Sequence, residues 1–213
     1  MSSKSGFEER LMKINVALEN CLKPPVIDCL STRGYGAERI NGILDIHTDV
    51  ISLNGIKDDA YNKQFQTTDE LNQLFGEVRK NYSKYRKLGR VSLADQPTTL
   101  KALKLSARIK SSLSGFVSQA RHFYVPATQD ETLANALLDT GLTREELEAE
   151  LPKLDQLEQL NIRQEYEKKV AQDATQRRDE RMAELDKCMA DLYKVGQVAL
   201  ADQPQFLELL KLN

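Results

Sequence analysis

Apolar residues recur at spacings of three and four over most of the chain, which is the pattern of amphipathic α-helices. The first such stripe consists of Phe7, Leu11, Ile14, Leu18 and Cys21. Ser5 followed by Glu8 has the spacing of a capping box, and the Pro24-Pro25 pair cannot continue a helix. We therefore expect a first helix over residues 5–22.

The same pattern predicts further helices in the first half of the chain, over residues 26–33, 36–64, 67–94 and 95–105. Gly34 suits the left-handed position that ends a helix. Thr67 and Glu70 have the spacing of a second capping box, so we expect a new helix to begin there. Asp95 is the expected N-cap of the last short helix, with Pro97 in its first turn.

The second half predicts a similar order of elements. Helices are expected over residues 107–124 and 130–139, ended by Pro126 and Gly141. Thr143 and Glu146 should cap the next helix, which Pro152 should kink. The last long helix carries Met182, Leu185, Met189, Leu192 and Gly196 on its expected buried face. Residues 172–181 contain neither Gly nor Pro, and both a turn and a continuous long helix fit this stretch.

An internal repeat connects the two halves. Residues 87–105, KLGRVSLADQPTTLKALKL, match residues 194–212, KVGQVALADQPQFLELLKL, at a shift of 107 positions. Gly34 meets Gly141 in the same register. Self-similarity at a fixed period is the signature of a repeat architecture. We therefore predict a first helical repeat over 1–106 and a second over 107–213, sharing one core. The expected fold is an all-α antiparallel helical bundle made of two sequence-similar halves with pseudo-twofold symmetry.

Composition supports the helical prediction. Charged residues make up 29% of the 213 residues, whereas Trp is absent and aromatic residues amount to 6%. Strands prefer aromatic and β-branched residues, so this balance favours helices. No apolar run approaches the ~20 residues of a membrane helix, and the N-terminus lacks the apolar core of a secretory signal. Cys21, Cys29 and Cys188 are odd in number and form no C-x-x-C pair. This pattern fits reduced thiols in a cytoplasmic protein rather than a disulfide framework or a zinc site.

The Leu-Ala-Asp-Gln-Pro motif occurs in both halves. Its structural motif residues are Gly89, Asp95 and Pro97, and Gly196, Asp202 and Pro204 in the second copy. The two aspartates fit helix N-caps, and a paired acid or metal site is the alternative. The two glycines lie on the apolar seam, where Gly costs about 0.5–1 kcal/mol relative to Ala. We therefore expect two long helices to cross closely near these glycines.

No pattern indicates catalysis or a resident metal. His47 and His122 lack the Glu three residues earlier that a ferritin-like di-iron site requires, and His47 falls on an apolar face, as a core histidine does. The chain contains no G-x-S-x-G nucleophile elbow and no glycine-rich phosphate loop. We expect a non-enzymatic protein with no catalytic residue, metal ligand or cofactor.

One segment is strongly basic. Residues 79–110 contain ten Lys and Arg residues, and Asp95 is the acid among them. The candidate binding patch consists of Arg79, Lys80, Lys84, Arg86, Lys87 and Arg90. An acidic run over 145–158 offers a matching surface within the molecule or between subunits. The patch would suit nucleic acid or an anionic surface, but a net charge of −2 argues against nucleic acid.

The pattern G-Y-G-x-E-R-I, a long charged helix and a closing L-x-D-x-P-x-x-L-x-x-L-K-L resembles a family of uncharacterised bacterial all-helical proteins with an internal tandem duplication. The resemblance implies a bacterial, cytoplasmic protein and transfers no activity or site residue. The expected function is therefore a structural or protein-interaction module that binds a partner or itself. The alternatives are a nucleic-acid or anionic-surface binder through residues 79–110, and a small-molecule site between the halves.

Overall fold

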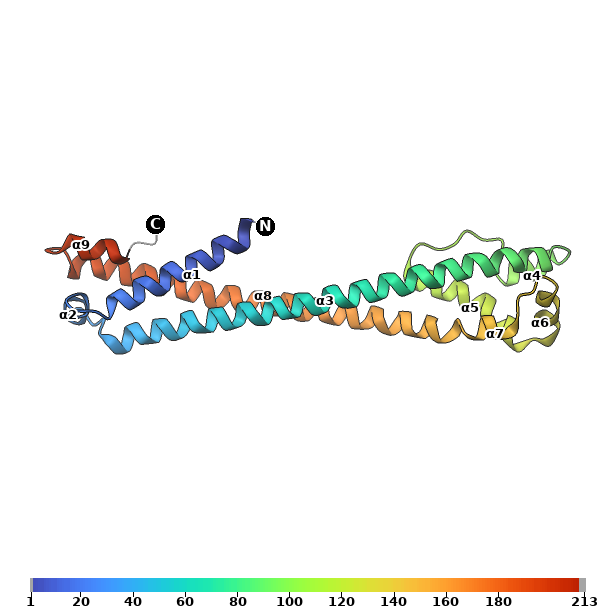
Figure 1. Cartoon of the computed structure of the whole chain (residues 1–213), viewed down its shortest axis with the longest axis horizontal. Helices are drawn as coiled ribbons and strands as arrows, with labels where there is room; N and C mark the ends of the chain where they lie inside the picture. Colours follow the sequence, from blue (N-terminus) through green and yellow to red (C-terminus); the bar gives the residue numbers. More distant parts are fainter. Residues whose placement is uncertain (1, 211–213) are drawn as a thin grey trace. The chain divides into compact units, whose positions relative to one another are not determined.

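The computed structural model describes the backbone of residues 2–210 and the side chains of residues 6–210. Within this range every regular element is helical, as predicted (Figure 1). The helices are α1 (Ser2–Cys21), α2 (Val26–Ser31), α3 (Ala37–Ser92), α4 (Pro97–Ala102), α5 (Leu113–Gln129), α6 (Glu131–Leu138), α7 (Arg144–Glu148), α8 (Leu151–Ala199) and α9 (Pro204–Leu207), followed by a 3-10 turn over Glu208–Leu210.

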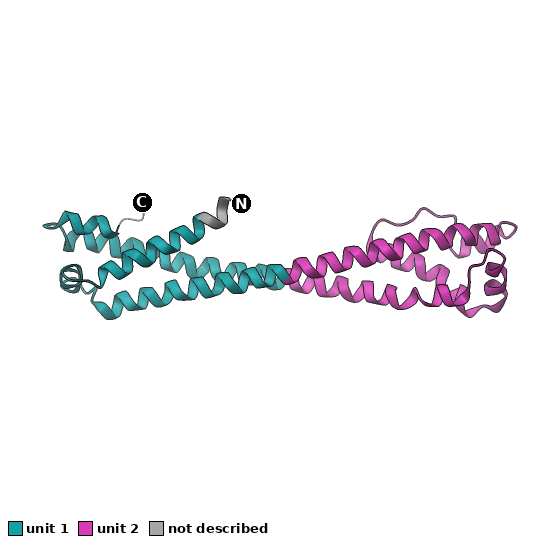
Figure 2. Ribbon diagram, in the orientation of Figure 1, with its two compact units in different colours: residues 1–62, 169–213 teal, residues 63–168 magenta. Residues whose placement is uncertain are grey.

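The chain forms two compact units, shown in different colours in Figure 2. Unit 1 combines residues 1–62 with 169–213, and unit 2 consists of residues 63–168. Helices α3 and α8 contribute to both units and run antiparallel within each. In unit 1, Arg181 of α8 binds Asp49 of α3, and in unit 2, Lys153 of α8 binds Glu77 of α3. Later residues of α3 therefore pair with earlier residues of α8, as in antiparallel helices.

Each unit has its own hydrophobic cluster. In unit 1, α1, α2 and the nearby parts of α3 and α8 bury side chains such as Ile14, Leu18, Ile40 and Leu185. In unit 2, α5 packs its aromatic residues against α3, and the ring centroids of Phe116 and Tyr82 lie 5.4 Å apart. The buried apolar residues of the described part of the chain thus form one large cluster in each unit, with a small alanine cluster besides. Each cluster nevertheless contains side chains from both sequence repeats, 1–106 and 107–213.

The predicted helix start at Thr67 is wrong, because Thr67 lies inside α3, which has 56 residues in all. Thr67 is fully buried inside the helix, so its side chain is not positioned as an N-cap. The Thr-x-x-Glu spacing also arises by chance within charged helices, and no Pro interrupts α3. The sequence allowed either a turn or a continuous helix over residues 172–181. This stretch is helical throughout and belongs to α8.

Pro126 and Pro152 act differently from the predictions. Pro126 does not end its helix but lies inside the last turn of α5, which continues to Gln129. Pro152 does not kink a longer helix. The chain leaves the helix after Glu148, and Pro152 falls in the first turn of α8, where a missing N–H costs no helical hydrogen bond.

Other local predictions are confirmed. Gly34 and Gly141 have φ angles of +78° and +71°, in the left-handed region that glycine tolerates best. Thr143 and Glu146 form the predicted capping box at the start of α7. Helix α1 begins at Ser2, before the predicted start, and the side chain of Ser5 lies outside the described part of the chain.

Candidate interaction surfaces

Two arginines of the predicted basic patch have a structural role. The Nε atoms of Arg86 and Arg90 each donate a hydrogen bond to the carbonyl oxygen of Leu105, both at 2.6 Å. Arg86 also donates to the carbonyl of Ala107. Burial and the adjacent Arg90 charge lower the pKa of the Arg86 guanidinium. These hydrogen bonds therefore hold the connection between α4 and α5 against α3.

The same connection explains why α5 begins later than the predicted residue 107. The Gln119 side chain accepts a hydrogen bond from the backbone N–H of Lys110 at 2.9 Å and donates to the carbonyl of Arg108 at 3.2 Å. Residues 108–110 consequently lie outside any helix and are hydrogen-bonded to α5 through Gln119. The sequence gives no periodic signal for such a contact, because it depends on side chains that meet only in the folded unit.

The remaining patch residues are divided between internal contacts and solvent. Lys84 Nζ lies 3.6 Å from Glu146 and 5.1 Å from the Tyr85 ring centroid, which links the basic segment to the acidic run. Arg79 lies 5.8 Å from the Phe75 ring centroid. Lys80 and Lys87 are exposed. Four of the six patch residues, Lys80, Lys84, Lys87 and Arg90, are thus exposed.

The repeated motif positions its prolines as predicted but not its aspartates. Pro97 and Pro204 occupy the first turns of α4 and α9. The N-cap residues are Gln96 and Gln203, and neither side chain caps its helix. Asp95 and Asp202 stand one residue earlier and are exposed, so the prediction of an Asp N-cap is wrong. No three His, Cys, Asp or Glu side chains of the described residues are grouped to hold a metal ion.

Gly89 and Gly196 do not mark a crossing of two helices, which corrects the prediction. Gly89 packs in unit 2, where an added Cβ would lie 3.3 Å from both Leu105 and Phe123. Gly196 packs in unit 1, where a Cβ would lie 2.8 Å from Leu210. In each case the neighbours are apolar side chains of the same unit. The glycines therefore make room for side chains rather than for a second backbone.

The two histidines bind backbone carbonyls. His47 is buried, and its Nε2 lies 2.9 Å from the carbonyl oxygen of Leu11, as expected for a core histidine. His122 Nδ1 lies 2.7 Å from the carbonyl of Ser118 on its own helix. The three cysteines are free thiols. Burial raises the pKa of Cys21 to about 12, which keeps that thiol protonated at neutral pH.

A groove between α1 and α3 in unit 1 was not anticipated. It encloses about 530 Å³ and is lined by Phe7, Glu8, Leu11, Met12, Asn15, His47, Thr48, Ile51 and Asn54. Met12 and Ile51 are 63% and 51% exposed. Both are apolar residues that fall outside the predicted buried stripes. This is the feature of the sequence that could have indicated the groove.

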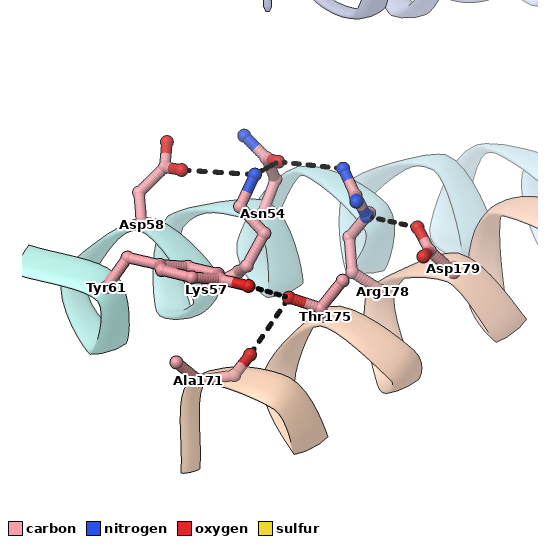
Figure 3. A network of polar contacts seen from close by, with 8 residues as sticks. All are labelled: Asn54, Lys57, Asp58, Tyr61, Ala171, Thr175, Arg178 and Asp179. Carbon is pink, nitrogen blue, oxygen red and sulfur yellow. Dashed lines mark hydrogen bonds and ion pairs between the residues drawn. The ribbon is translucent and has the colours of Figure 1, made fainter. Parts of the chain in front are cut away.

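A polar network includes Asn54, which also lines this groove (Figure 3). Asn54 Oδ1 accepts a hydrogen bond from Lys57 at 3.1 Å and from Arg178 at 3.4 Å. The Arg178 guanidinium also lies 4.9 Å from the Phe7 ring centroid. Beyond the network, Ala60 of α3 packs with Ala171 and Ala174 of α8 in a cluster of small residues. Asn54, at the lining of the groove, is therefore hydrogen-bonded to Arg178 of α8.

Unit 2 has acidic residues at the positions that correspond, in the repeat, to two residues of the groove. Asp155 and Glu158 lie 107 residues after Thr48 and Ile51. Arg121 binds both carboxylates, each at 2.6 Å, and so closes the surface between α5 and α8 with ion pairs. The apolar surface formed by Met12 and Ile51 is thus a property of unit 1.

Two smaller hollows are lined by residues from both sequence repeats. One, in unit 1, encloses about 480 Å³ and is lined by Tyr35, Glu38, Arg39, Gly42, Ile43, Ile46, Cys188 and Asp191. The other, in unit 2, encloses about 310 Å³ between α3 and α8 and includes Glu70, Glu77 and Gln156. Among the helices of the described residues, none combines the length and the apolar character needed to cross a membrane.

Comparison with protein-family models gives no match to this chain, and comparison with curated proteins or with solved structures gives none either.

Proposed function

We propose that this protein is a non-enzymatic helical interaction module whose groove in unit 1 binds an amphipathic helix of a partner protein. The observation that carries the proposal is the exposure of Met12 and Ile51 above the more buried Leu11. Fully burying one such side chain contributes about 1.5–3 kcal/mol. A partner that covers both would therefore gain substantial affinity from this surface.

The lining indicates the chemistry of the occupant. A groove between two helices suits a third helix that inserts apolar side chains spaced three or four residues apart. Glu8 is the acidic residue in the lining, and neutral side chains such as Asn15 and Thr48 form the rest of the polar rim. The expected partner helix therefore presents an apolar face with neutral polar flanks.

The test is binding of a partner by the full chain and by Ile51→Arg. Proteins retained from native cells on the immobilised chain would be identified by mass spectrometry, and a purified candidate would then be titrated. We expect Ile51→Arg to weaken binding at least tenfold, because it places a charge against an apolar face. Val91→Arg, at a 68% exposed apolar residue of unit 2, is the matched control and should bind as the wild type does. Equal binding by Ile51→Arg and the wild type would contradict the proposal.

Self-association is the other possible use of the same surface. Sedimentation equilibrium of the purified chain distinguishes the two occupants. A dimer that Ile51→Arg abolishes would identify a second copy as the partner, in line with the homo-oligomer expected from the sequence. A monomer that still binds a purified helical partner would support the proposal as stated.

Binding of nucleic acid or an anionic surface through residues 79–110 is a second candidate. The exposure of Lys80 and Lys87 favours it, whereas the engagement of Arg86 and Arg90 with backbone carbonyls weighs against it. Retention on immobilised DNA that falls steeply with salt and is lost in Lys80→Glu with Lys87→Glu would favour this function.

A small-molecule site between the sequence halves is the third candidate. The hollow that contains Tyr35, Arg39 and Cys188 supports it, since residues of both repeats line it. Protection of Cys188 from alkylation by a bound metabolite would favour this function over protein binding.

We also propose that the two sequence repeats arose by duplication and adopt related folds. The order of long and short helices recurs, and the left-handed glycines Gly34 and Gly141 stand 107 positions apart. An experimental structure in which α2–α4 superimposes on α6–α9 with matched buried positions would support pseudo-twofold symmetry. Unrelated paths of these segments would contradict it.

A further inference from the structure

The core of unit 2 contains a buried carboxylate. Glu150 lies between α7 and α8 and is 2% exposed. Its Oε1 atom accepts hydrogen bonds from Asn81 Nδ2 and from Lys153 Nζ, both at 2.9 Å. Its Oε2 atom is buried and has no hydrogen-bond partner among the described protein groups. A buried carboxylate oxygen without a donor is costly, so this atom requires an explanation.

A second polar atom without a partner lies in the same core. Tyr124 of α5 is fully buried, and its hydroxyl has no hydrogen-bond partner among the described protein groups. Its ring contacts Tyr82 and Tyr85 of α3, with centroid distances of 5.9 and 6.4 Å. Burying a hydroxyl without a hydrogen bond is also unfavourable.

Neighbouring residues of α3 contact both Glu150 and Tyr124. Asn81, which binds Glu150, precedes Tyr82 directly and lies one turn before Tyr85. Both tyrosines contact Tyr124. One turn of α3 therefore contacts the carboxylate and the phenol. The electrostatics agree, because burial raises the pKa of Tyr124 and the Glu150 charge raises it further.

We propose that Glu150 and Tyr124 form an internal water-binding site in unit 2, in which a bound water donates to Glu150 Oε2 and pairs with the Tyr124 hydroxyl. Buried waters in proteins typically make two to four hydrogen bonds to such otherwise unsatisfied groups and contribute to the native structure. The site joins α5 to the junction of α7 and α8, and through Asn81 also to α3. It is independent of the groove in unit 1.

The stability test compares the full chain with Tyr124→Phe, Glu150→Gln and the double variant. Amide hydrogen exchange of α3 and α5 in unit 2 is the readout, so that the measurement reports on this unit. We expect Tyr124→Phe to increase exchange of the protected amides at least fivefold, because the water loses one partner. In the Glu150→Gln background the same change should have an effect below twofold. If the Tyr124 hydroxyl has no partner at all, Tyr124→Phe should instead leave amide exchange unchanged or slow it, and that result would contradict the proposal.

Tyr82→Phe is the matched control. Tyr82 is also fully buried, and its hydroxyl has no hydrogen-bond partner among the described residues. Its electrostatic neighbours are Arg86 and Arg90 rather than Glu150. Its effect should therefore be the same in the wild type and in Glu150→Gln. A crystal structure that resolves ordered water gives the direct test. Density within about 3 Å of both Tyr124 Oη and Glu150 Oε2 would support the site. A direct bond between the two side chains, or a dry contact, would overturn it.

Discussion

Arg86 of α3 and Leu105, beyond the end of α4, are joined by a hydrogen bond of 2.6 Å from the guanidinium Nε to the backbone carbonyl. Arg90, one turn further along α3, donates to the same oxygen. Carbonyl groups outside regular structure need such donors when they are partly buried. Two positive charges that resembled a binding surface in the sequence thus hold a connection within unit 2.

Removal of these donors should destabilise the connection between α4 and α5. We expect Arg86→Met to lower the stability of unit 2 by about 1.5–3 kcal/mol, the contribution of a hydrogen bond from a charged group. Hydrogen exchange over residues 105–119 would measure the effect. Lys87→Met, at the adjacent exposed position, should change the same exchange rates little. Similar effects of the two substitutions would contradict the assigned role of Arg86.

Gly89 should not tolerate a larger side chain. A Cβ at this position would lie 3.3 Å from Leu105 and Phe123, so Gly89→Leu must displace the core. Overpacking of this kind typically costs about 1–3 kcal/mol, and thermal denaturation would detect it. Gly76→Leu in the same helix is the control, because no atom lies within 4 Å of its Cβ position. There the higher helix propensity of Leu should raise the melting temperature. A Gly89→Leu protein as stable as Gly76→Leu would refute the packing argument.

The thiols should differ in reactivity. Burial raises the pKa of Cys21 from 9.0 to about 12, so its reactive thiolate is scarce at pH 8. We expect iodoacetamide to modify the partly exposed Cys29 and Cys188 first, and Cys21 only on unfolding. Because the folded-state pKa is raised, the contribution of this thiol to stability is present below pH 9 and is lost as the pH rises towards 12. Mass spectrometry of the modified peptides checks the order, and early labelling of Cys21 would contradict it.

Local signals in the sequence predicted the helical class and several helix ends. Gly34, Gly141 and the Thr143–Glu146 box determine structure through their own backbone and nearest neighbours, so each was identified correctly. Thr67 has the same signal in a different context. There the burial of Leu71 and Val78 in the core of unit 2 favours a continuous helix over a new start.

The candidate surfaces were harder to predict because they depend on which helices meet. The role of Arg86 follows from the return of Leu105 to α3, and periodicity carries no information about that contact. The groove likewise requires Met12 of α1 and Ile51 of α3 to lie on the same side of unit 1. Each residue alone is an ordinary exposed apolar side chain.

The central claim, that the unit 1 groove binds a partner helix, is tested most directly by photo-crosslinking in the native cell. The crosslinking amino acid p-benzoylphenylalanine would replace Met12 in the groove or, as the control, Val91 in unit 2. We predict one discrete crosslinked protein from position 12, which disappears when Ile51→Arg is added and is not formed from position 91. Crosslinks from position 12 that match those from position 91, or that persist with Ile51→Arg, would contradict the account.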